Sequence, residues 1–218
     1  MSLPLLLGSC GEKSSPEDSR SPSENQTATS EEVEPDEPIA GNEPAAAVSF
    51  SPNFEYEIQG DIVTITGCDK KASGALIIPV TIEGKPVTSI GKSAFSRCYS
   101  LTSIRIPDSV TSIGKEAFSS CSSLTSITIP DSVTRIGDYA FVHCTSLRSI
   151  AIPAAVEVIR NGVFDNCTSL TKLIFLGDAP EDKTGLINTF PTIYRKPESK
   201  GWDDKWSRRP VELISEKP

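Results

Sequence analysis

The most reactive side chains in the sequence are the cysteines, and four of them follow a fixed interval. Cys98, Cys121, Cys144 and Cys167 are each 23 residues apart. A structural zinc site needs ligands that converge, usually from closely spaced cysteine pairs, and a disulfide needs side chains that point at each other. Equal spacing instead predicts one column of parallel side chains, so we expect buried, reduced thiols and no metal or other cofactor. Cys68 lies outside the series and has no predicted partner.

His143 is the only histidine, and therefore the only candidate for an imidazole general base. Arg97 and Ser120 stand at the same place in the neighbouring repeats, and no nucleophile recurs beside them. The sequence contains no G-x-S-x-G, P-loop, dinucleotide-binding or H-E-x-x-H motif. We therefore predict an exposed surface histidine, no catalytic residue and no enzymatic activity. A hydrolase with an unrecognised site is the minor alternative.

The cysteine interval belongs to a repeat that covers much of the chain. Residues 90–112 and residues 113–135 are identical at 18 of 23 positions. A repeat of this length predicts a solenoid, in which each unit buries its apolar side only by stacking on its neighbours. Three residue types should then form interior columns, which we name the structural ladder: Phe95, Phe118, Phe141, Phe164, Cys98, Cys121, Cys144, Cys167, Leu101, Leu124, Leu147 and Leu170.

Each unit has the pattern of two short strands joined by turns. In residues 103–106 two isoleucines alternate with Ser and Arg, which is the period of a strand with one buried face. Pro107 ends the strand, and Asp108 supplies turn chemistry before a second extended piece at residues 110–113. Residues 115–121 have Ala, Phe and Cys at spacings that suit a short helical turn. The sequence therefore predicts a strand-rich α/β solenoid, with two short strands and a short helical turn in each 23-residue coil.

The repeated pattern I-G-x-x-A-F-x-x-C-x-S-L-x-x-I-x-I-P-x-x-V resembles the BspA-like leucine-rich repeats of bacterial surface proteins. The resemblance extends from Asp61 to about Leu213. It implies a first coil with a longer turn at residues 75–90, and a C-terminal closure that contains Trp202 and Trp206. It also implies an adhesive or protein-binding surface rather than a catalyst.

These features divide the chain into five segments. Residues 1–10 are a lipoprotein signal remnant, 11–47 a disordered acidic linker, 48–89 an N-terminal cap and first half coil, 90–181 four leucine-rich repeats, and 182–218 a C-terminal cap. In the last full coil, Arg160 replaces the repeated glycine and Phe175 replaces an isoleucine. These changes indicate a coil that adapts to the cap.

The formal charge of the whole chain is −8, and all of it lies in residues 11–47. That segment has ten acids, two bases, five prolines and no aromatic residue. Such a composition cannot bury enough apolar area to offset the entropy of ordering, so we expect disorder. The remaining body is neutral and has no basic stripe, which argues against binding of nucleic acid.

Cys10 follows Leu7, Gly8 and Ser9, a run that resembles a bacterial lipobox, in which the cysteine receives diacylglycerol. The charged start of a signal peptide is missing, and an incidental apolar N-terminus is the alternative. The acidic segment favours the lipobox interpretation, because a lipid anchor, a flexible linker and a folded domain, in that order, are the layout of a surface lipoprotein. We therefore expect lipidation of Cys10, localisation at the bacterial cell envelope, and membrane contact through this anchor only.

Outward positions of the first strand in successive coils should form one extended sheet face. The predicted ligand face consists of Ser103, Arg105, Ser126, Thr128, Ser149, Ala151 and Lys172. A solvated face that serves only solubility is the alternative. Trp202 and Trp206 are predicted to cover the end of the last coil, and binding aromatics are the alternative. We predict a monomeric, non-catalytic module that binds a protein or other surface ligand, with a passive structural spacer as the alternative.

Overall fold

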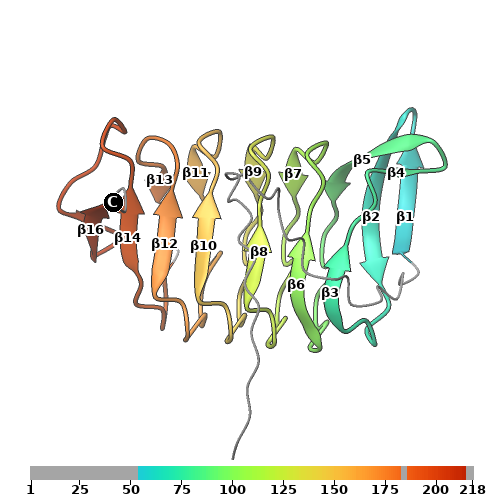
Figure 1. Cartoon of the computed structure of the whole chain (residues 1–218), viewed down its shortest axis with the longest axis horizontal. Helices are drawn as coiled ribbons and strands as arrows, with labels where there is room; N and C mark the ends of the chain where they lie inside the picture. Colours follow the sequence, from blue (N-terminus) through green and yellow to red (C-terminus); the bar gives the residue numbers. More distant parts are fainter. Residues whose placement is uncertain (1–53, 183–185, 215–218) are drawn as a thin grey trace, which may run out of the picture. The chain divides into compact units, whose positions relative to one another are not determined.

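The computed structural model describes residues 54–182 and 186–214, and within them the chain forms sixteen short β-strands (Figure 1). Their bounds are β1 Phe54–Gln59, β2 Ile62–Cys68, β3 Gly74–Ile77, β4 Thr81–Ile82, β5 Lys85–Ile90, β6 Leu101–Arg105, β7 Ser112–Ile113, β8 Ser126–Thr128, β9 Arg135–Ile136, β10 Ser149–Ile152, β11 Val158–Ile159, β12 Lys172–Phe175, β13 Glu181–Asp182, β14 Thr192–Arg195, β15 Lys205–Trp206 and β16 Arg209–Leu213. Successive strands wind into the coils of a solenoid, as the repeat predicts.

Two rows of parallel strands enclose the core. Face A contains β3, β6 and β8 in one hydrogen-bonded block and β10, β12, β14 and β16 in the next, and face B contains β2, β5, β7, β9, β11 and β13 (Figure 1). Partners in neighbouring repeats are 23 residues apart, such as Ile104 with Ile127 on face A and Ile113 with Ile136 on face B. A register of one repeat length brings the same side chain of each coil to the same place in the core.

The segment expected to form a helical turn instead makes a row of backbone hydrogen bonds to the next coil. The described residues contain no helix. Phe95 N donates to Ala117 O of the next coil at 2.8 Å, whereas Cys98 N donates to Phe95 O within its own turn at 3.1 Å. Arg97 has a φ of 64°, and a left-handed residue of this kind interrupts any helix. Along this segment every second backbone N–H therefore donates a hydrogen bond to the next coil. We name residues 91–100 and their equivalents the turn edge.

The structural ladder fills the interior between the two faces and the turn edge. The rings of Phe95, Phe118, Phe141 and Phe164 stack in parallel, with successive centroids 5.2, 5.2 and 5.7 Å apart. All twelve ladder residues are buried, and none is more than 2% exposed. Because identical side chains meet at every step, one packing arrangement repeats along the solenoid.

The two ends of the solenoid are covered by different elements. At the N-terminal end, β1 pairs antiparallel with β2, and Phe54 lies edge-on to Phe95 with ring centroids 6.4 Å apart. At the other end, Phe175 lies 5.1 Å from Trp202 and 5.0 Å from Trp206, measured between ring centroids. The indole Nε1 of Trp206 donates to Pro180 O at 3.1 Å. Both tryptophans thus pack on the end of the core, and β15, which contains Trp206, pairs with β16.

Candidate ligand-binding face

Outward side chains of face A stand in two columns that cross the strands. The strand register defines the first column as Ala75, Ser103 and Ser126, and the second as Ile77, Arg105 and Thr128. The residues between the columns, such as Ile104 and Ile127, are buried, because successive side chains of a strand point to opposite faces. The first column is therefore short throughout, and the second rises above it at Ile77 and Arg105.

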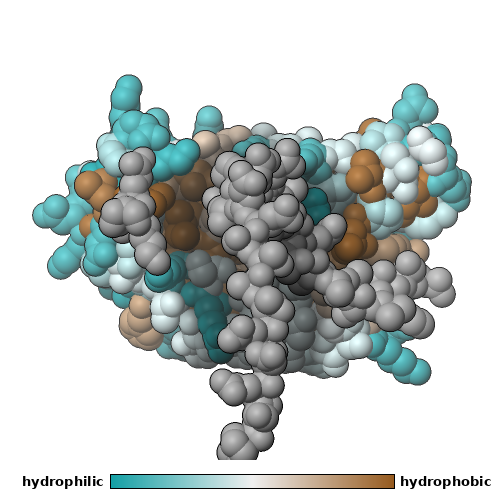
Figure 2. All heavy atoms as spheres, viewed as in Figure 1, coloured by the Kyte–Doolittle hydropathy of each residue, from teal (hydrophilic) through white to brown (hydrophobic). Residues whose placement is uncertain are grey.

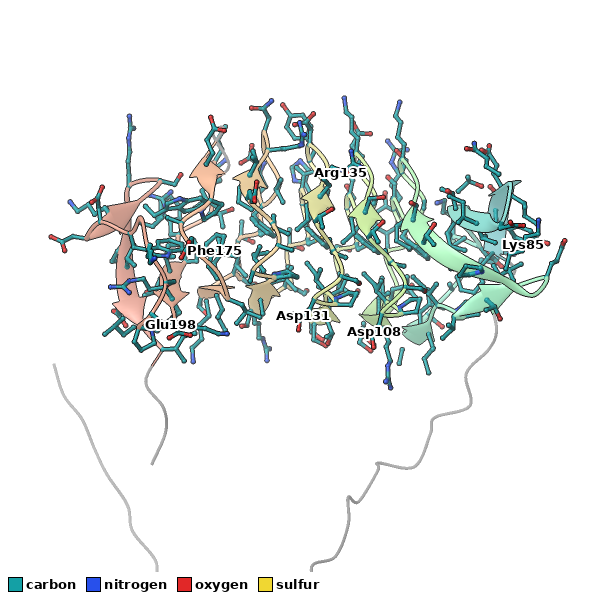
Figure 3. The ribbon with its side chains drawn as sticks, turned by 90° about the horizontal axis from the view of Figure 1, so that it is seen from above. Lys85, Asp108, Asp131, Arg135, Phe175 and Glu198 are labelled. Carbon is teal, nitrogen blue, oxygen red and sulfur yellow. The ribbon has the colours of Figure 1, made fainter. Side chains whose placement is uncertain are left out.

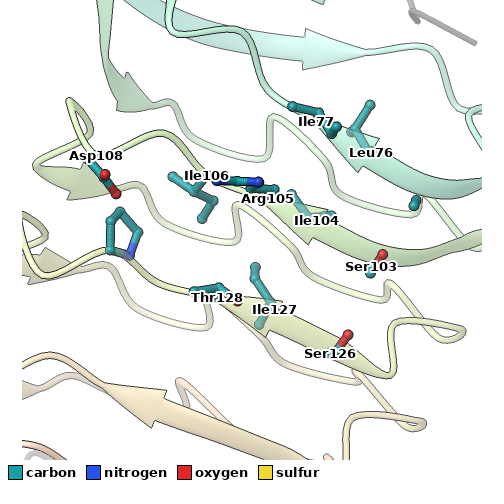
Figure 4. A pocket seen from close by; sticks show the side chains of 12 residues that line it. Leu76, Ile77, Ser103, Ile104, Arg105, Ile106, Asp108, Ser126, Ile127 and Thr128 are labelled. Atoms are coloured by element: carbon teal, nitrogen blue, oxygen red, sulfur yellow. The ribbon is translucent and has the colours of Figure 1, made fainter. Parts of the chain in front are cut away.

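The surface over β3, β6 and β8 is hollowed, and residues of both columns line the depression (Figure 4). Twelve residues line the depression, which we name the face A hollow: Ala75, Leu76, Ile77, Ser103, Ile104, Arg105, Ile106, Asp108, Ser126, Ile127, Thr128 and Pro130. Four of the seven residues predicted for the ligand face are among them. The structure therefore brings Ser103, Arg105, Ser126 and Thr128 together around one concave surface.

The other three predicted residues lie farther along face A and do not line the hollow. Ser149 and Ala151 stand on β10, and Ser149 pairs in register with Lys172 on β12. The Nζ of Lys172 lies 5.9 Å from the centroid of the Tyr194 ring, which gives this ammonium a cation–π contact. The predicted ligand face is thus one surface with two distinct parts.

Arg105 and Asp108 are the two charged residues that line the hollow. Both are exposed. Within residues 54–182 and 186–214, the ion pairs join Lys85 to Asp61 and Lys115 to Glu116, so the guanidinium of Arg105 has no acidic partner there. From above, Asp108 lies on one side of the core and Arg135 on the opposite side (Figure 3). Within the described residues, the hollow therefore presents one cation and one carboxylate that form no ion pair, among hydroxyl and aliphatic side chains.

Two exposed aliphatic residues beside Arg105 were not among the predicted site residues. Ile77 is 60% exposed and Val80 is 62% exposed, and Figure 2 shows hydrophobic surface near this N-terminal end of the described coils. A second, smaller depression is lined by both residues together with Arg105 and Asp108. The sequence contains a usable signal, because residues 76–78 are all apolar and the middle one must face outward in a strand.

All four ladder cysteines are free thiols, and three of them bond to the main chain of the preceding coil. Cys121 Sγ donates to Phe95 O at 3.1 Å, and Cys144 and Cys167 repeat this contact at 3.1 and 3.0 Å. Burial raises the pKa of Cys121 and of Cys167 to about 12, and it raises the pKa of Cys144 well above the ordinary value. These thiols are therefore protonated and unreactive at neutral pH.

Each end of the cysteine column has its own partner. Cys68, for which the sequence indicated no partner, lies against Cys98, and the hydrogen bond between the two thiols raises the pKa of Cys68 and lowers that of Cys98. At the other end the buried Thr189 takes the cysteine position, and its Oγ1 donates to Phe164 O at 2.6 Å. A hydroxyl thus satisfies the carbonyl that a thiol satisfies elsewhere.

The remaining candidates for chemistry lie apart from the hollow. His143 is exposed on the turn edge, where its backbone N–H donates to Asp165 O at 2.9 Å. No group of three or more His, Cys, Asp or Glu side chains within residues 54–182 and 186–214 is arranged to hold a metal ion. Among the same residues no helix is long and apolar enough to cross a membrane. Cys10 lies outside the described residues.

Comparison with known proteins agrees with this architecture. The family described as BspA type leucine-rich repeat region matches residues 77–181 in six copies. A crystal structure of a T. pallidum leucine-rich repeat protein is 30% identical, with a TM-score of 0.55, and the match covers 65% of this chain and 68% of that one. A leucine-rich repeat protein from Bacteroides capillosus is 33% identical, with a TM-score of 0.50, over 58% of this chain and 99% of that one.

No curated protein matches the sequence. The assignment rests on the family match, on the identity with the two crystal structures, and on the 23-residue coils of the solenoid itself. On this basis the chain belongs to the family of BspA-type leucine-rich repeat proteins.

Proposed function

We propose that the protein is a non-catalytic module that binds a protein or other surface ligand outside the bacterial cell, through face A. The observation that carries this proposal is the face A hollow, where four residues of the predicted ligand face converge. Within the described chain, no side-chain hydrogen bond or ion pair is made by these four residues, Ser103, Arg105, Ser126 and Thr128. Such groups are available to a ligand.

Repeat architecture supports a binding role. In a solenoid the interior positions specify the fold, while outward positions on a sheet vary freely and form an extended surface. Face A follows this division, because the buried Ile104 recurs as isoleucine in the next two coils, whereas the outward Arg105 is followed there by Thr128 and Ala151. Membership of the BspA-type family supports the same role.

We extend the proposal to the attachment of the module. Diacylglycerol on Cys10 would hold the chain at the cell envelope, and the acidic residues 11–47 would act as a leash between the anchor and the solenoid. Metabolic labelling with a fatty-acid analogue in a bacterial host should mark the wild-type chain but not the Cys10→Ala variant. Wild-type protein that carries no label, expressed with its genomic upstream codons, would refute the anchor while leaving the binding role untouched.

The binding role is tested by surface plasmon resonance with the full chain over immobilised host-matrix and bacterial surface proteins. We expect a saturable signal on at least one of them, weakened by Arg105→Ala combined with Thr128→Ala. The matched control combines Arg135→Ala with Thr134→Ala, the same two residue types exposed on face B, and should leave the signal unchanged. Lys172→Ala should have a smaller effect, because Lys172 stands outside the hollow.

A passive structural spacer would give a different pattern. It would show no saturable signal on any surface, and its sedimentation in the analytical ultracentrifuge would show self-association. That pair of results would replace the binding proposal with the structural one.

A further inference from the structure

The chemistry of the face A hollow limits the kind of ligand that it can hold. A nucleic-acid strand requires a series of cations along its phosphates, and the hollow has the single cation Arg105. A stacked sugar or base requires an aromatic platform, and none of the twelve lining residues is aromatic. The hollow instead combines the guanidinium of Arg105, the carboxylate of Asp108, three hydroxyls and exposed aliphatic carbon, and groups of these kinds recognise the side chains and main chain of a peptide.

Arg105 supplies the charged part of this recognition. A guanidinium has five N–H donors in a planar fork that matches the two oxygens of a carboxylate. Its neighbours in the column, Ile77 and Thr128, carry no charge, and within the described residues no acidic side chain forms an ion pair with it. An incoming carboxylate therefore need not displace an existing partner.

Ile77 and Val80 supply the apolar part. They are 60% and 62% exposed and line the smaller depression together with Arg105. Ile77 and Arg105 are register neighbours on adjacent strands, whose spacing is about 4.8 Å. In an extended peptide, side chains on the same side recur about every 6.8 Å. A single peptide segment can therefore place one side chain on Arg105 and another, one or two positions along the peptide, on Ile77.

We propose that the face A hollow binds an extended segment of a partner protein in which a carboxylate side chain meets Arg105 and a nearby aliphatic side chain covers Ile77 and Val80. The hydroxyls of Ser103, Ser126 and Thr128 then donate hydrogen bonds to, and accept them from, the main chain of that segment. This inference rests on the proposed binding function and adds the chemistry of the partner.

The test is selection of a random twelve-residue peptide library, displayed on phage, against the immobilised full chain. We expect the enriched peptides to share Asp or Glu within two positions of Leu, Ile or Val. Selection on the Arg105→Glu variant should enrich Lys or Arg at that position instead. A synthetic copy of the leading wild-type peptide, followed by fluorescence anisotropy, should bind the Arg105→Glu variant about tenfold or more weakly, and Ile77→Ser should also weaken it.

The control is Arg135→Glu, the same charge reversal on face B, which should change the dissociation constant less than about twofold. Enriched peptides that lack an acid, or that ignore Arg105→Glu while losing affinity with Ile77→Ser, overturn the proposed chemistry and leave the binding function intact. A failure to enrich any peptide that depends on the hollow also overturns the proposed chemistry, whereas the binding function is decided separately by the surface plasmon resonance experiment.

Two other occupants of the hollow would give results of their own, one in the peptide selection and one in sedimentation. If peptides are enriched only after the ten acids of residues 11–47 are changed to amides, the chain's own acidic segment occupies the hollow and the proposed partner is wrong. If sedimentation shows a dimer that Arg105→Glu dissociates, the occupant is a second copy of the chain, which also overturns the proposal.

Discussion

Inside the solenoid, Phe95 and its three equivalents are all phenylalanine, whereas on face A the column that contains Arg105 changes residue from coil to coil. Both rows come from the same 23-residue unit. The interior row is constant because each ring packs on a copy of itself 5.2 to 5.7 Å away. The outer row has no such constraint, and it is therefore free to become a ligand surface.

The interior row should be the most sensitive to substitution. Phe118→Ala removes a ring that packs between two others, and we expect it to lower the free energy of unfolding by about 3–5 kcal/mol. Tyr99→Ala, at a residue 53% exposed on the turn edge, should change it by less than about 0.5 kcal/mol. Urea unfolding of both variants checks the difference.

If Phe118→Ala does not fold, Phe118→Leu provides the measurement, since leucine retains much of the buried volume and should cost less. If substitution at Phe118 and at Tyr99 lowered the free energy of unfolding by the same amount, the stacked rings would not be a main source of the stability of the core.

The repeated glycine gives the second comparison. A Cβ on Gly137 would lie 2.5 Å from Lys115 N in the preceding coil, so Gly137→Ala should lower the free energy of unfolding by about 2 kcal/mol through overpacking. Arg160 occupies the equivalent place in the last full coil and is exposed. Arg160→Ala should therefore be neutral within about 0.5 kcal/mol, and thermal unfolding of the two variants should separate them. A neutral Gly137→Ala would mean that the coils can shift apart at little cost.

The buried thiols add a pH dependence that exposed residues of face A cannot. Burial raises the pKa of Cys121 from 9.0 to about 12, so above pH 9 the unfolded chain releases a proton that the folded chain retains. The free energy of unfolding therefore falls as pH rises between these values. Between pH 8 and pH 10 the wild type should lose about 1.4 kcal/mol more than Cys121→Ala. Parallel pH profiles would indicate that this thiol is already solvated in the folded protein.

The sequence predicts the interior better than the surface, for a physical reason. The ladder, the coil length and the family follow from identity at fixed spacing, because packing forces equivalent core residues to match. The turn edge was predicted as a helical turn, which is wrong: positive φ at Arg97 and its equivalents is set by hydrogen bonds to the next coil. Such contacts between coils leave no helical or strand period in the sequence.

The sequence predicts only those site residues that the repeat brings to face A. The lining of the hollow includes residues 75–77, which belong to the atypical first coil. Thr189 replaces a ladder cysteine 22 residues after Cys167 instead of 23, in the segment after the last full coil. Both features lie where the repeat is imperfect, so extrapolation from the repeat could not identify them.

The most direct test of the division between a constant interior and a variable ligand face measures binding and stability on the same variant. Arg105→Ala combined with Thr128→Ala should abolish or strongly weaken the saturable surface plasmon resonance signal. It should change the free energy of unfolding by less than about 0.5 kcal/mol, because both side chains are exposed. An unchanged signal, or a weaker signal accompanied by a comparable loss of stability, would contradict the account.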